Sequence, residues 1–439
     1  MFKETSKELL DFLSKSPTAF HAVENYRQIL NADGFKELLE SEHWDIVPGG
    51  KYYVTRNNTS ILAFKVGTKL DNYSFNIVTS HTDSPTFKVK ENAEIEVKNK
   101  YTQLNTEGYG GMLCATWLDR PLSIAGRVLV SEGNSIVTKL LNIDRDLLMI
   151  PNVAIHMNRA ANDGFKYNLQ VDMLPLLSAG DDRQKDFKQI IADELGVKKE
   201  DILGHDLYLY NRMAPSIWGA NEEFISAGHL DDLQCGFASL KALLAGYNDE
   251  SIDIMACFDN EEVGSGTKQG ADSTLLRDTL TRINSALGKT EEDYYRALAS
   301  SFMLSSDNAH AVHPNHPEHT DATNCTYMNE GVVVKSHAGQ KYTSDGVSMA
   351  VVKALASGAD VPLQYFANRS DKAGGSTLGN IAMAQASMNA VDIGLPQLAM
   401  HSSYETAGIK DTYYAITLMK ALFDSHIQET STHSLEIKR

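Results

Sequence analysis

The sequence predicts an α/β protein whose two α/β stretches are separated by a β-rich insert. Apolar strands that end abruptly in polar residues alternate with helical segments before residue 88 and after residue 228. Between these limits the texture changes to short alternating runs, which are typical of antiparallel strands. We therefore expect one domain built from residues 1–87 and 229–439, with residues 88–228 inserted into it as a second domain.

The first stretch predicts a helical segment followed by two strands. Residues 5–31 repeat apolar side chains at helical spacing, and Ser60–Val66 and Tyr73–Thr79 are apolar runs. The second run leads into His81 and Asp83, at the strand end where open α/β sheets bind ligands. Residues two apart on an extended segment point the same way, so Asp83 can orient the His81 ring. An H-x-D pair alone is nevertheless more typical of a surface.

The insert is predicted to be mostly antiparallel sheet. Strands are expected at Gly126–Val130 and Asp206–Tyr210, and a helix at 186–195. Inserted domains often form contacts between subunits. His156 follows an apolar run here, and the residues alone favour a core or interface histidine.

A helix is predicted to begin at Gly228-His229-Leu230-Asp231-Asp232, because Leu233, Phe237, Leu240 and Leu244 lie on one helical stripe. Aspartates at a helix start commonly cap its free amides and favour its dipole. A carboxylate that bridges two metal ions is the alternative for Asp231.

The stretch Asp259-Asn260-Glu261-Glu262 follows the apolar run 252–256 and leads into a Gly-Ser-Gly turn. Adjacent glutamates project to different sides, so one can bind a cation while the other transfers a proton. Alone, the same run would be typical of a charged surface loop.

The rest of the chain alternates strands and helices. Asp307 follows the strand 301–304, and His401 follows the strand 395–400. The other elements are strands at 331–335 and 361–367, helices at 347–357, up to about 387 and at 411–426, and a polar tail that we expect to be frayed.

Five candidate ligands share one setting. His81, Glu262, Asp307 and His401 each follow an apolar strand, and Asp231 starts a helix. The strands of one parallel sheet would bring these ends together, and two histidines with three carboxylates can hold two zinc ions if one carboxylate bridges them. The histidine-rich loop 310–319 contains prolines and lacks helical spacing, so we expect it to be a rigid loop rather than a metal site.

Composition excludes several classes of function. The formal charge of −17 without a basic run argues against nucleic acid as a partner. Four scattered cysteines signal neither a disulfide framework nor a thiolate zinc site and fit a cytoplasmic protein. No run approaches the roughly 18 apolar residues of a membrane span, so we expect no membrane partner.

Five ordered stretches, 80–85, 228–233, 259–265, 306–317 and 398–405, resemble the M18 aminopeptidases, the family of aspartyl aminopeptidase. The resemblance covers nearly the whole chain. It implies a phosphorylase/hydrolase-like zinc-peptidase catalytic domain interrupted by a dimerisation domain, assembled into dimers and a tetrahedral dodecamer. The implied substrates are peptides, cleaved after the N-terminal residue.

The resemblance also implies roles for individual residues. His81, Glu262, Asp307 and His401 become terminal ligands of two ions, and Asp231 bridges them. Glu261 becomes the general base for a bridging hydroxide, and Asp83 fixes the His81 ring.

The family pattern makes His156 a residue that reaches the active site of a neighbouring subunit, where it can bind the oxyanion. Lys335, Gly375 and Ser376 are placed at the substrate, with Lys335 favouring an acidic first residue. The chain departs from the family at Gly374, where cysteine is common, and at Asn380, where proline is usual; both departures leave the metal site intact and the finer substrate preference open.

Alternatives remain at this point. Zinc, cobalt and manganese accept the same ligands. A related dizinc amide hydrolase, such as a deacylase or carboxypeptidase, or a non-catalytic assembly of the same fold would share most of these residues.

Overall fold

The computed structural model describes residues 1–180 and 186–439, and its main element is a nine-stranded mixed sheet. The central strands β13, β4, β14 and β18 are parallel to one another, and the strands outside them include antiparallel neighbours. The strands, in their order across the sheet, are β1 (Lys36–Glu37), β2 (Lys51–Arg56), β3 (Ser60–Val66), β13 (Ser251–Phe258), β4 (Ser74–His81), β14 (Phe302–Ser306), β18 (Asn389–Gly394), β16 (Val332–Lys335) and β17 (Leu363–Phe366).

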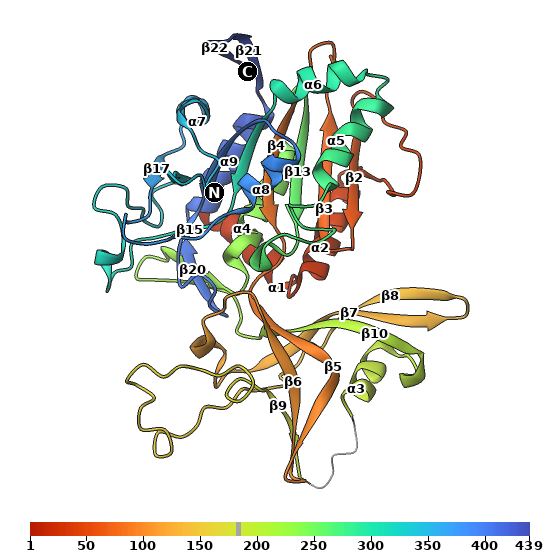
Figure 1. Cartoon of the computed structure of the whole chain (residues 1–439), viewed down its shortest axis with the longest axis vertical. Coiled ribbons are helices and arrows are strands. Elements are labelled where there is room, and N and C mark those ends of the chain that lie inside the picture. Colours follow the sequence, from red (N-terminus) through yellow and green to blue (C-terminus); the bar gives the residue numbers. More distant parts are fainter. Residues whose placement is uncertain (181–185) are drawn as a thin grey trace.

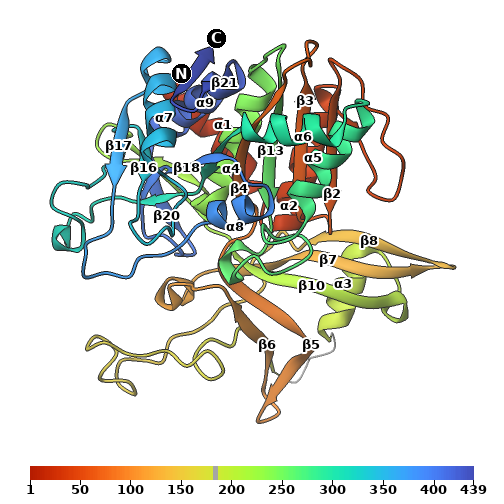
Figure 2. The same ribbon diagram turned by 45° about the horizontal axis from the view of Figure 1, so that its top comes forward.

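Helices cover both faces of this sheet, and the alternation of the strands explains why. Ile254 and Ala256 pack into one core, whereas Met255 and Cys257 pack into the other, because successive side chains of a strand point to opposite faces. The first face carries α5 (Leu275–Ala286), α6 (Glu291–Ala299) and α8 (Leu378–Gln385), which lie on the near side of the strands in Figures 1 and 2. The second carries α1 (Phe2–Ser14), α2 (Ala19–Ala32), α4 (Leu230–Ala245), α7 (Gly346–Gly358) and α9 (Asp411–Phe423).

A second, six-stranded antiparallel sheet begins at Thr86, just before the predicted insert at residue 88, and otherwise lies within that segment; it occupies the lower half of Figure 1. Its core also takes up one face of α3 (Phe187–Leu195), whose N-cap residue Asp186 accepts a hydrogen bond from the Gln189 amide at 2.7 Å. The strands, in order, are β8 (Ser135–Asn142), β7 (Leu122–Glu132), β10 (Ile202–Asn211), β5 (Thr86–Val97), β6 (Tyr101–Tyr109) and β9 (Leu176–Ala179). Short 3-10 helices are η1 (Cys114–Trp117), η2 (Lys199–Asp201), η3 (Glu261–Val263) and η4 (Pro317–His319).

A third sheet of five strands joins the end of the predicted insert to the C-terminal part of the chain. Its order is β11 (Ser216–Trp218), β12 (Phe224–Ala227), β20 (Glu405–Gly408), β19 (Pro396–Leu398) and β15 (Ala309–His310). The antiparallel pairing of β12 with β20 brings Ala227 opposite Glu405. This pairing places the start of α4 beside the loop that follows β19.

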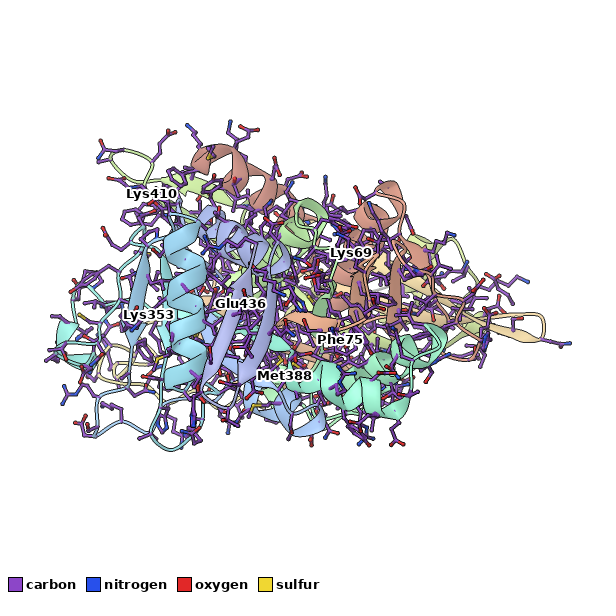
Figure 3. All side chains as sticks on the ribbon, turned by 90° about the horizontal axis from the view of Figure 1, so that it is seen from above. Lys69, Phe75, Lys353, Met388, Lys410 and Glu436 are labelled. Atoms are coloured by element: carbon purple, nitrogen blue, oxygen red, sulfur yellow. The ribbon has the colours of Figure 1, made fainter. Side chains whose placement is uncertain are left out.

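The segment 5–31 is helical, as predicted, and consists of two helices, because Pro17 cannot continue the hydrogen-bonded ladder of α1. One local prediction is wrong. The tail is not frayed: β21 (His426–Ser431) and β22 (Ser434–Lys438) form a hairpin, and Arg439 donates to the Ala354 carbonyl of α7 at 2.8 Å. Buried Ile427 anchors this hairpin to the core. Figure 3 labels Glu436 on the hairpin, Lys353 on α7, and Phe75 of β4, which is fully buried.

All four cysteines are free thiols, as their spacing predicts. None of the helices in the described ranges is both long enough and apolar enough to cross a membrane.

Candidate active site

Three candidate ligands follow neighbouring parallel strands in the middle of the main sheet. His81 ends β4, and the glutamate pair follows β13, whose last residue, Phe258, is paired with His81. Asp307 follows β14, on the other side of β4. The carboxyl ends of parallel strands meet at one edge of a sheet, so these side chains converge, as the sequence predicts.

The other two ligands reach this edge from outside the main sheet. Asp231 lies in the first turn of α4 and has non-helical backbone angles, and its peptide bond to Asp232 is cis. Neither aspartate caps the helix, so the capping alternative is wrong. His401 follows β19, which belongs to the five-stranded sheet, so the expectation that the strands before His81, Glu262, Asp307 and His401 share one sheet is also wrong.

The two carboxylate oxygens of Asp231 face one histidine each. The Nε2 atom of His81 lies 3.6 Å from Asp231 Oδ1 and 3.8 Å from Asp307 Oδ1. The Nε2 atom of His401 lies 3.5 Å from Asp231 Oδ2 and 3.4 Å from Glu262 Oε2. The geometry therefore pairs His81 with Asp307 and His401 with Glu262, with Asp231 between them.

These spacings fit ions rather than direct hydrogen bonds. Two atoms that each lie about 2.0–2.1 Å from a tetrahedral zinc ion are about 3.3–3.4 Å apart, close to the measured separations. Asp231 Oδ1 and Glu262 Oε1 are buried and have no hydrogen-bond partner among the described residues. Buried carboxylate oxygens without partners are costly, and divalent cations would satisfy them.

Electrostatics support the same interpretation. Burial favours neutral His401, but Asp231 and Glu262 outweigh it and raise its pKa to about 10. Burial also works against a charged His81, yet Asp231 and Asp307 raise its pKa well above the ordinary value. Both histidines thus hold protons against an excess of carboxylates, and metal ions would replace those protons.

Glu261 lies in the same cluster, with a ligand atom within 4.8 Å of one on His81 and one on Glu262. Burial raises its pKa to about 8, His81 opposes this shift, and Asp307 adds to it. An elevated pKa of this kind is typical of carboxylates that transfer protons.

The loop that carries Glu261 and Glu262 and the loop that carries His401 both contain residues in the left-handed backbone region. Asn260 and Ser265 have positive φ angles of 64° and 60°, and His401 has one of 66°. Such angles in residues other than glycine cost about 1–3 kcal/mol each and concentrate at functional sites. Asp83 holds the loop, since its carboxylate accepts the amides of Glu261 and Glu262 at 3.2 Å each.

Asp83 contacts the His81 ring in two ways. Nδ1 of His81 lies 3.0 Å from the Asp83 carbonyl oxygen and 3.4 Å from its carboxylate. The shorter contact is therefore made by the backbone, which the H-x-D pattern did not predict.

The sequence reasoning missed two further residues. Glu405 is buried and accepts the amides of His401 at 2.8 Å and Asp231 at 3.0 Å. Tyr109 of β6 donates to Asp83 Oδ2 at 2.6 Å. Glu405 lies in the stretch 398–405, and its place in a stretch that resembles the family could have marked it as a site residue. Nothing in the sequence marks Tyr109 in this way, because a tyrosine is common in an alternating strand.

A pocket of about 410 Å³ opens over the cluster. Its lining includes Lys335, Gly375 and Ser376, for which the family resemblance implies substrate contact, and His310 of the histidine-rich loop. Lys335 is buried, donates to the Asn308 carbonyl at 2.9 Å, and lies 3.8 Å from Asp307 Oδ2.

His156 is not brought to this pocket. It is exposed in the segment between β8 and β9, which is yellow and projects from the lower half of the molecule in Figures 1 and 2. Three residues of the histidine-rich loop, His316, Glu318 and His319, form a separate exposed group.

Comparisons with known proteins identify the family of this chain. The family model described as aminopeptidase I zinc metalloprotease (M18) matches residues 12–423. A probable M18 family aminopeptidase 2 of Clostridium novyi (strain NT) is 48% identical over 425 residues, which cover 95% of this chain and 98% of the relative.

Solved structures share the fold over nearly the whole chain. A cryo-EM structure of the Ape4 and Nbr1 complex matches with a TM-score of 0.93 and 35% identity, covering 96% of this chain and 86% of that one. The S. cerevisiae mApe1 dodecamer matches with a TM-score of 0.84 and 28% identity, covering 96% and 97%. The chain therefore belongs to the M18 family of zinc metalloproteases and is a metalloaminopeptidase.

Proposed function

We propose that the chain is a dinuclear aminopeptidase in which Asp231 bridges two zinc ions. The observation that carries this proposal is that the two oxygens of one buried carboxylate each face a different histidine, at 3.6 and 3.5 Å. His81 and Asp307 complete one position, and Glu262 and His401 complete the other. Cobalt or manganese would suit the same nitrogen and oxygen ligands. When bound, the two ions supply positive charge that polarises the scissile carbonyl and eases deprotonation of the attacking water.

Glu261 is the general base of this proposal. Its carboxylate takes a proton from the attacking water and returns it to the leaving amine, a task for which its pocket position and its raised pKa are suited. Asp83 fixes the loop on which Glu261 lies, through two backbone amides. Asp83 and Glu405 are thus positioning residues.

The preferred substrates are peptides with an acidic N-terminal residue. Lys335 is buried in the wall of the pocket, and its ammonium group lies 3.8 Å from Asp307 Oδ2. An Asp or Glu side chain would pair with this charge in a site that excludes much water. Gly375 and Ser376, which line the mouth of the same pocket, would contact the substrate backbone.

We also propose that residues 88–228 are a dimerisation domain of a phosphorylase/hydrolase-like fold, and that dimers assemble into a dodecamer. Exposed apolar side chains are frequent on this segment: Met157 is 84% exposed and Val171 69%. Such groups mark contact surfaces when they gather on one part of a protein. His156 lies beside Met157, so the same contact would carry it into the active site of a neighbouring subunit.

Replacing Glu261 by glutamine tests the chemistry. We expect the Glu261→Gln variant to bind two zinc ions as the wild type does, while kcat falls by about 10²–10⁴-fold. Glu436→Gln, an exposed carboxylate on β22, is the control and should retain full activity. The wild type should cleave peptides with a free N-terminus and should not cleave the same peptides after N-acetylation. Full turnover by Glu261→Gln, or cleavage of acetylated peptides, would contradict the proposal.

A further inference from the structure

Residues 109–113 comprise the last residue of β6 and the segment that joins it to η1. They contact the loop that carries Glu261 and Glu262 and the loop that carries His401. They belong to the β-rich insert by sequence, whereas every ligand belongs to the rest of the chain. We call residues 109–113 the connector. Its contacts fall into three groups.

The first contact reaches the glutamate loop. The Tyr109 hydroxyl donates to Asp83 Oδ2 at 2.6 Å and accepts from Asn260 Nδ2 at 2.8 Å. The Asp83 carboxylate then holds the amides of Glu261 and Glu262. One hydroxyl of the connector thus fixes both the residue before the glutamates and the carboxylate that supports them.

The second contact reaches His401. Its Nδ1 atom lies 3.0 Å from the Gly111 carbonyl oxygen, and its own carbonyl accepts the Leu113 amide at 3.0 Å. A carbonyl acceptor at Nδ1 requires the hydrogen there, which leaves the Nε2 lone pair free to face Asp231 and Glu262. The connector therefore sets both the orientation and the tautomer of this histidine.

The third contact is steric. Gly110 has a φ angle of +72°, and a Cβ atom there would lie 3.1 Å from Glu262 Cβ and 3.4 Å from Pro85. The connector approaches the glutamate loop so closely that only glycine fits without strain. Gly110 therefore lies directly against Glu262, and Gly111 against His401. Glu262 and His401 are assigned to the same ion.

We propose that the connector is a positioning element of the metal centre, so that the insert completes the site within one chain. The Glu262–His401 position depends on it most, because all three groups of contacts act on these two residues or on the loops that carry them. The inference rests on the proposed function for the identity of the ligands. It adds that residues making no contact with an ion control how tightly the ions are held.

A pair of hydroxyl deletions tests the first contact. Tyr109→Phe removes two hydrogen bonds and keeps the ring, which packs edge-on against Tyr208 at 5.7 Å. Tyr208→Phe is the matched control, because both tyrosines line one cavity and the described residues offer the Tyr208 hydroxyl no hydrogen bond. Loss of such a supporting contact typically weakens metal binding about 10–100-fold. We expect that loss in Tyr109→Phe alone, measured by competition with a zinc chelator, with equal melting temperatures for the two metal-free variants.

A pair of glycine substitutions tests the steric contact. Gly110→Ala adds a methyl group against Glu262, whereas Gly133→Ala, in the β7–β8 turn, has a comparable φ of +64° and nothing within 4 Å. We expect Gly110→Ala to retain one tightly bound zinc ion and to lose the second, while Gly133→Ala retains both. Metal content by mass spectrometry after dialysis gives the number.

Wild-type affinity in Tyr109→Phe together with two retained ions in Gly110→Ala would overturn the inference and leave the proposed function intact. Wild-type protein that binds fewer than two ions would instead contradict the proposed function. If Tyr109→Phe does not fold, the glycine pair decides alone.

Discussion

Asp231 is the residue on which the two halves of the site meet. Five acidic side chains, Asp231, Asp232, Glu261, Glu262 and Asp307, gather around two histidines at the edge of the sheet. Burying so many carboxylates without compensating charge is costly. Burial lowers the pKa of His401, but Asp231 and Glu262 outweigh this and raise it to about 10, which is consistent with an excess of negative charge. Two divalent ions are the compensation that the donor atoms and their spacing favour.

We propose that a single residue, Lys335, determines the preference for an acidic N-terminal residue. We expect Lys335→Gln to lower kcat/KM for peptides with N-terminal Asp at least about tenfold, because the buried charge partner of the substrate carboxylate is lost. Peptides with N-terminal Leu should be affected much less. Lys353→Gln, on the exposed face of α7, is the control. An equal loss for both peptides would show that Lys335 supports the site without selecting its substrate.

Individual elements were predictable where burial dictates their pattern. Ser60–Val66 has the predicted bounds, since all of its residues are buried. β4 runs two residues further than predicted, because its parallel pairing with β13 continues to His81. The three residues of β19 could not be assigned to a separate sheet, since their pairing with β20 depends on a distant segment. The C-terminal hairpin was missed because its exposed positions are polar.

At the scale of one helix, α2 predicts a pH dependence of stability. Burial lowers the pKa of His21 to about 4, against 6.5 for an unperturbed histidine. In the unfolded chain His21 therefore binds a proton below pH 6.5, whereas in the folded chain it binds one only near pH 4. Protonation thus favours the unfolded state, and stability falls as the pH decreases through this window.

This dependence should disappear when the histidine is replaced. Between pH 7 and 5 we expect the free energy of unfolding of the wild type to fall by about 1–2 kcal/mol more than that of His21→Gln. His433→Gln, in the exposed turn of the C-terminal hairpin, should behave like the wild type. Urea titrations of metal-free protein at both pH values measure the difference, and parallel losses in all three proteins would contradict the assignment.

The whole molecule is organised around the junction of the insert and the α/β part. The connector contacts the loops that carry the proposed metal ligands, and the exposed apolar side chains of the insert form the surface that we propose for a second subunit. The mixed α/β class and the convergence of the candidate ligands could be predicted from sequence, because binding sites in such proteins lie at strand ends. The connector could not be predicted, since its key acceptor is a backbone carbonyl.

Mixed assemblies test whether subunits share their sites. His156→Ala and Glu261→Gln should each be nearly inactive alone. When the two variants are refolded together, a mixed dimer holds one site that combines an intact Glu261 with an intact His156 from the neighbouring subunit. About half of randomly formed dimers are mixed and each has one active site of two, so about a quarter of wild-type activity should be recovered. Recovery should require joint unfolding and refolding, and simple mixing of stable assemblies is the control. No recovery after verified co-assembly would mean that His156 acts within its own subunit or not at all.

The most direct test of the account is a crystal structure of the zinc-loaded protein, with anomalous differences measured on both sides of the zinc absorption edge. We expect two zinc peaks, one on each side of Asp231, with His81 and Asp307 around the first and Glu262 and His401 around the second. Glu261 should lie beside the space between them without binding either ion. A single peak, or peaks held by other residues, would contradict the account.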